Sequence, residues 1–77
     1  MVGRYDPRTQ EHVVDVIVEQ VTWHGRMAYG HGRDDAGQAV SFVAEPTMLA
    51  TLEEAIGEGR QPVAAVPTWA LFAGPKA

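Results

Sequence analysis

The sequence predicts an α+β domain built on a small curled antiparallel sheet or partly open barrel, with the element order β-β-β-α-β. Three strand-like stretches come first, a short segment with helical spacing follows, and an apolar strand comes last. A length of 77 residues leaves room for one domain. We expect a flexible lead-in over residues 1–10, the domain over 11–73 and a tail over 74–77.

The first predicted strand runs from His12 to Trp23 and is rich in β-branched residues. Alternation places Val14, Val16 and Val18 on one wholly apolar face, which should belong to the core. The opposite face mixes apolar and acidic side chains, so we expect it to be only partly covered.

A turn at His24 and Gly25 should lead into a second strand over about residues 26–33. Gly30 and Gly32 alternate on one face of that strand. Because glycine has no side chain, this face permits tight curling or the close approach of another backbone.

The residues from Asp34 to Gly37 predict a tight turn into a third strand over about residues 38–44. Val40, Phe42 and Ala44 should lie on its inner face. The two strands therefore form a hairpin.

A helix is predicted over about residues 46–57, with Pro46 at its first position and a glycine at its end. Leu49, Leu52 and Ile56 recur at helical spacing. We expect these three side chains to pack onto the sheet.

The last apolar segment is interrupted by Pro67, which cannot donate a ladder hydrogen bond. The segment is therefore an edge strand, or two short strands divided at Pro67. Trp69 and Leu71 alternate with Ala70 and Phe72, so both faces are apolar. One face can pack inward and the other requires a partner. We predict a protein interface at Trp69, Leu71 and Phe72.

The element order and the glycine-rich second strand resemble the OB-fold barrel, in which a helix bridges the third and fourth strands. The resemblance covers about residues 11–73. It requires a fifth strand, which Pro67 would have to separate from the fourth. An OB-like domain would bind through its second and third strands, which implies a site at Tyr29, His31 and Arg33.

The same region gathers aromatic and basic residues: Trp23, Arg26, Tyr29, His31 and Arg33. Such a mixture can stack nucleic-acid bases and bind phosphates. The opposing interpretation is cross-strand packing with charges that solvate the sheet. A net charge of −4 favours packing, because phosphate binding normally requires a basic excess.

Chemical motifs are absent from the sequence. The three histidines, at positions 12, 24 and 31, lack metal-ligand spacing, and the chain has no cysteine. Ser41 lies mid-strand with no obvious base in the sequence, and the adjacent carboxylates should diverge. We therefore predict no enzyme activity, no metal site and no cofactor.

Composition also predicts a location. No signal peptide and no stretch long enough to span a bilayer is evident, so we expect a cytoplasmic protein without a membrane partner. Five of the six basic residues are Arg, and Ala, Gly and Val are frequent. This usage suggests a high-GC genome, such as that of an actinomycete or one of its phages.

Together these patterns predict a non-catalytic protein-binding or self-associating module, expected to be a homo-oligomer because so small a core gains from burying more surface. A single-stranded nucleic-acid binder is the alternative. A small-molecule or regulatory domain is a weaker third hypothesis.

Overall fold

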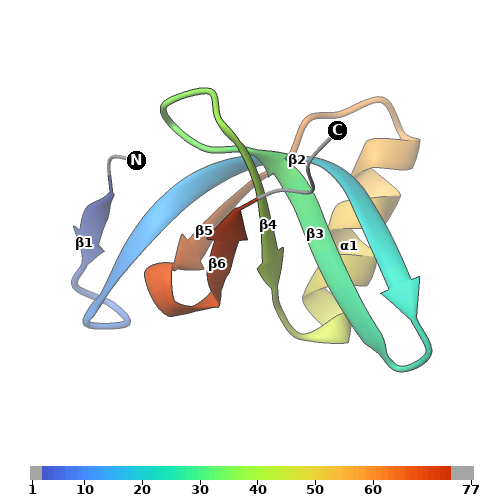
Figure 1. Cartoon of the computed structure of the whole chain (residues 1–77). Coiled ribbons are helices and arrows are strands. Elements are labelled where there is room, and N and C mark those ends of the chain that lie inside the picture. The colour runs from blue at the N-terminus through green and yellow to red at the C-terminus, as the bar shows by residue number, and fades with distance from the viewer. Residues whose placement is uncertain (1–2, 74–77) are drawn as a thin grey trace.

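The computed structural model describes residues 3–73. It confirms the predicted α+β class and the curled antiparallel sheet (Figure 1). The elements are β1 (Arg4–Asp6), β2 (Glu11–His24), β3 (Met27–Arg33), β4 (Ala39–Val43), α1 (Pro46–Gly57), β5 (Val63–Pro67), the 3₁₀ helix η1 (Thr68–Ala70) and β6 (Leu71–Ala73). No helix of residues 3–73 has the length and apolar character needed to cross a membrane.

The long strand β2 organises the sheet, whose order is β1-β2-β3-β4-β6. Its residue Ile17 pairs with Arg33 of β3 and with Val63 of β5, so these two strands lie on opposite edges of β2. Over residues 3–73, β5 and β6 are consecutive but do not pair with each other. The sheet therefore curls into a partly open barrel that remains unpaired between β5 and β6, which is compatible with the OB-like resemblance.

The core lies between the inner face of this sheet and α1, which packs against β2 and β3 (Figure 1). The predicted inner-face residues are buried and Ala44 packs beside them, and the helix has the predicted bounds. The buried cluster comprises Val14, Val16, Val18, Ala28, Val40, Phe42, Leu49, Leu52, Ala64, Val66 and Ala70.

Of the two glycines of β3, Gly32 permits the close approach of another backbone, as predicted, and Gly30 accommodates a side chain. A methyl group at Gly30 would overlap the ring of Phe42 on β4. A methyl group at Gly32 would overlap the backbone carbonyl of Ile17 on β2. At Gly32, β3 therefore approaches the backbone of β2 more closely than a residue with a Cβ would allow, whereas Gly30 leaves space for the Phe42 ring.

The last apolar segment forms two short strands divided at Pro67, which is the second of the two alternatives predicted from the sequence. The Val18 N–H donates to the Pro62 carbonyl at 2.9 Å, which fixes the hydrogen-bonding phase between β2 and the chain entering β5. Because backbone groups alternate along a strand, Ala64 and Val66 point toward β2 and Pro67 points away from it. The missing N–H of Pro67 therefore costs the ladder nothing.

The lead-in expected over residues 1–10 contains a strand that the sequence did not predict. β1 is three residues long, too short to show an alternating pattern, and pairs with the beginning of β2. The Arg4 guanidinium donates to both carboxylate oxygens of Asp15, at 3.0 and 3.1 Å. Pairing and this ion pair together hold β1 on the sheet.

The Arg4–Asp15 ion pair predicts a pH dependence of stability. Hydrogen bonding from Arg4 lowers the pKa of Asp15 in the folded protein. The pair therefore contributes stability above the ordinary pKa of Asp, about 4, and loses it as the pH falls through the lowered value. Both side chains are about half exposed, so the effect is small and screened by salt.

We expect the thermal midpoint of the wild-type protein to fall more steeply below about pH 4 than that of Asp15→Asn. Arg4→Gln is the matched control, because it removes the same ion pair from the other side. Parallel pH profiles for the wild type and both variants would contradict this prediction.

Candidate functional site

An apolar groove of about 500 Å³ opens where the sheet is unpaired. We call it the seam groove. Its floor is buried and belongs to the core, whereas Met48 and Trp69 on its rim are exposed, Trp69 by 76%. The lining residues are Phe42, Val43, Ala44, Glu45, Met48, Ala65, Val66, Pro67, Trp69 and Ala70.

The seam groove runs along strand edges rather than across one face of the sheet. Its lining includes two consecutive runs, residues 42–45 at the end of β4 and residues 65–67 of β5. Consecutive strand residues point to opposite faces, so a groove touching all of them follows the backbone edge. β6 pairs with residues 40–42 of β4 and leaves residues 43–45 without a partner on that side.

Trp69 is held at the rim by η1. Its indole N–H donates to the carboxylate of Glu11, which lies at the beginning of β2. Trp69 lies in this 3₁₀ turn and not in a strand, and its side chain is exposed. A large aromatic side chain is thus exposed beside an apolar cavity and hydrogen-bonded to Glu11.

The structure separates the three predicted interface residues. Thr68–Ala70 form a helical turn, so the strand alternation expected from Trp69 to Phe72 is wrong. Leu71 packs against the core, whereas Phe72 is 46% exposed on the outer face. The Phe72 and Tyr29 rings meet edge to face, with their centroids 6.3 Å apart. Of the three, only Trp69 lines the seam groove.

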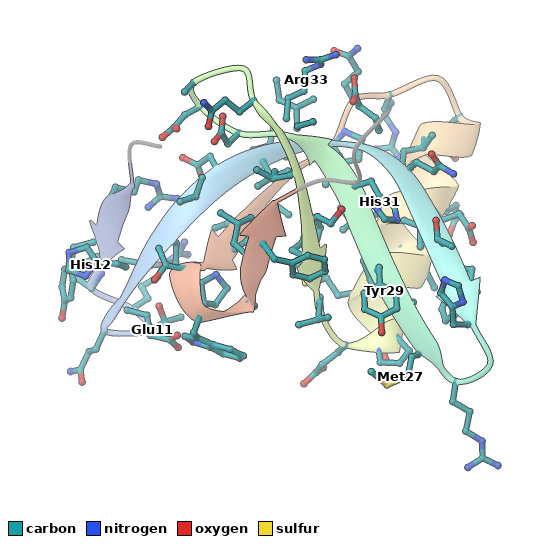
Figure 2. All side chains as sticks on the ribbon, in the orientation of Figure 1. Glu11, His12, Met27, Tyr29, His31 and Arg33 are labelled. Atoms are coloured by element: carbon teal, nitrogen blue, oxygen red, sulfur yellow. The ribbon has the colours of Figure 1, made fainter. Side chains whose placement is uncertain are left out.

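The outer face of β3, which faces away from α1, carries Tyr29 and His31 (Figure 2). The His31 Nδ1 lies 2.7 Å from the Ser41 hydroxyl, and its Nε2 lies 3.0 Å from the Thr22 hydroxyl. Both ring nitrogens are therefore engaged within the sheet. Tyr29 is likewise engaged, by edge contacts with His24 and Phe72.

Trp23 does not join this outer face, contrary to the grouping made from the sequence. A register shift between Val18 and Gln20 inserts an extra residue into β2 and switches the faces beyond it. Trp23 consequently pairs with the inward-facing Ala28, and its indole N–H donates to Glu53 of α1 at 3.2 Å. It lies on the helix side of the sheet.

The two arginines of the predicted cluster lie at opposite ends of β3. Arg26 is exposed in the turn before the strand. Arg33 lies 3.7 Å from the Glu19 carboxylate and donates to the Gly37 carbonyl at 3.1 Å. They do not converge with Tyr29 on one compact basic surface.

Carboxylates neutralise most of the arginines that the structure describes. The ion pairs are Arg4–Asp15, Arg8–Asp6, Arg33–Glu19 and Arg60–Glu58. A phosphate approaching these guanidiniums would have to compete with an existing anion.

Ser41 and His31 form a contact that sequence reasoning missed. The hairpin turn pairs Arg33 with Ala39. Two residues farther from the turn on each strand, His31 pairs with Ser41, so the turn signal could have predicted the contact. Ser41 is only 1% exposed, so its hydroxyl is closed to a substrate. This pair holds the sheet together and does not form an accessible nucleophile.

Among residues 3–73, no group of three or more His, Asp or Glu side chains converges. Comparisons with protein-family models, curated proteins and solved structures found no significant match to the chain.

Proposed function

We propose that this chain is a non-catalytic protein-binding or self-associating module whose contact surface is the seam groove with Trp69 at its rim. The main support is Trp69, which is 76% exposed, is hydrogen-bonded to Glu11 and lies beside an apolar cavity of about 500 Å³. Tryptophan is enriched among the residues that dominate binding energy at protein interfaces. Exposed apolar cavities of this kind are typical of contact sites.

Single-stranded nucleic-acid binding through the outer face has weaker support. The His31 ring nitrogens already bond to two hydroxyls, and Trp23 lies on the opposite side of the sheet. Neutralised arginines and a net charge of −4 further disfavour phosphate contacts.

We further propose self-association near Trp69 and Phe72, a cytoplasmic location, and an origin in a high-GC genome such as that of an actinobacterium or its phage. Self-association is the first to examine, because it requires no other molecule.

Sedimentation of the wild-type protein and of Trp69→Ser tests the proposal. A mass above 8.3 kDa that returns to 8.3 kDa in the variant identifies a second copy as the occupant. If both are monomers, the partner is a different protein. It would be isolated from the source organism and purified, and its binding to this chain would be measured directly.

For either partner, we expect Trp69→Ser to weaken binding by more than about tenfold, as loss of an interface tryptophan usually does. Ile17→Ser is the matched control, because Ile17 is 41% exposed, lies outside the groove lining and pairs with Arg33, at the end of β3 farther from Val43. Equal weakening by both variants, or by neither, would contradict the proposed surface.

A further inference from the structure

The edge of β5 that faces away from β2 is open over residues 3–73, where β5 pairs with β2 alone. The phase set by the Val18-to-Pro62 hydrogen bond points the backbone groups of Val63 and Ala65 toward this open edge. Each of the two residues offers an N–H and a C=O. Such an edge can accept an extended chain as an additional strand.

The seam groove lies beside this open edge, since Ala65, Val66 and Pro67 all line it. The backbone of a strand added to β5 would hydrogen-bond to the Ala65 backbone. Every second side chain of that strand would then point toward the groove. The floor at Phe42 and Val66 is fully apolar and suits an aliphatic or aromatic side chain. Backbone pairing supplies affinity in this mode and the groove supplies selectivity.

The charge around the seam groove favours a cationic occupant. Glu45 is the one ionisable side chain among the lining residues. Glu11 is also close, because its carboxylate accepts a hydrogen bond from Trp69 on the rim. A second copy of the chain would bring the same carboxylates and a further net charge of −4. A foreign segment that carries Lys or Arg avoids this repulsion and complements Glu45.

We propose that the seam groove binds an extended apolar segment of another protein, carrying at least one Lys or Arg, which pairs with the open edge of β5 as an added strand. This inference rests on the proposed function and specifies its partner class. It excludes a ligand that lies along the edge as a helix, because the backbone groups along a helix already bond to one another.

Selection from a displayed library of random linear peptides tests the inference, with Trp69→Ser as the counter-selected bait. We expect the enriched peptides to alternate apolar residues with others and to contain Lys or Arg. The best of these, made synthetically, is the probe. Its binding should slow hydrogen exchange at the Ala65 amide, which is unpaired in the free protein.

Two pairs of variants separate the backbone and charge contributions. Ala65→Pro removes the N–H at the open edge and should weaken the probe peptide about tenfold, whereas Ile17→Ser, outside the groove lining and the open edge, should not. Glu45→Lys should weaken the cationic peptide about fivefold, and Thr47→Lys, at an exposed position outside the lining, should weaken it less. Folding of each variant is checked by its thermal midpoint.

The possible failures are distinguishable. Enrichment of acidic or helical peptides, or of peptides that leave Ala65 exchange unchanged, overturns the added-strand inference while the groove remains a protein-binding site. A library without any peptide dependent on Trp69 also overturns it. The proposed function itself fails only if the binding of the purified natural partner, or self-association, is indifferent to Trp69→Ser.

Discussion

Gly32→Ala is expected to lower the free energy of unfolding by about 3 kcal/mol, although it adds a single methyl group. That methyl would overlap the carbonyl of Ile17 and press on the backbone of Val18 in β2. A flexible side chain could rotate away from such a clash, but the neighbouring strand's backbone cannot. The overlap also lies beside the register shift between Val18 and Gln20, so relief would disturb the pairing of β2 with β3.

Gly57→Ala is the matched control, because a methyl at the last residue of α1 meets nothing within 4 Å. Replacing a helical glycine by alanine should stabilise the protein by about 0.5 to 1 kcal/mol. Urea denaturation measures both variants, and their midpoints should move in opposite directions. A Gly32→Ala midpoint equal to that of the wild type would disprove the close strand approach.

The elements that could be predicted from the sequence are those with a repeating local pattern. Val14, Val16 and Val18 alternate, and alternation predicts one buried face of a strand. Leu49 and Leu52 recur at helical spacing between a proline and a glycine, which predicted the helix. In both cases the physical cause acts over a few residues, so the information is local.

The position of Trp23 could not be predicted, because it depends on one extra residue in β2. Simple alternation from Val18 does not show a β-bulge, whose signal is the pairing with another strand. Thr68–Ala70 are a similar case. Pro67 predicted a break in the last segment, but nothing in the sequence distinguished a helical turn from a second strand with a kink.

The seam groove depends on contacts between distant parts of the chain, which explains why only Trp69 among its lining residues was predicted as a site. It forms because η1 turns the chain away from β5 before β6 pairs with β4. Glu45 directly precedes α1 and Met48 lies within it, so neither belongs to a local pattern that indicates a groove. Their shared role emerges when the strand edges come together.

Phe42→Ala should cost about 3 to 5 kcal/mol, the largest single effect we expect from truncating a side chain in this core. The ring is fully buried in β4, between Gly30 of β3 and Leu71 of β6, with which Phe42 pairs. It also forms part of the groove floor. A domain of this size has only a few kcal/mol of stability, so the variant should be largely unfolded at body temperature.

A double-mutant cycle with Gly30 tests whether the ring occupies the space that the glycine leaves. Gly30→Ala alone should destabilise the protein by about 1 to 3 kcal/mol, because its methyl overlaps the Phe42 ring. With Phe42→Leu as the background, which removes the ring and keeps the fold, the same methyl enters vacated space and should cost little. The two free-energy changes should therefore differ by about 1 kcal/mol or more. Additive changes in urea denaturation would show that Gly30 is required for strand curvature and not for the ring.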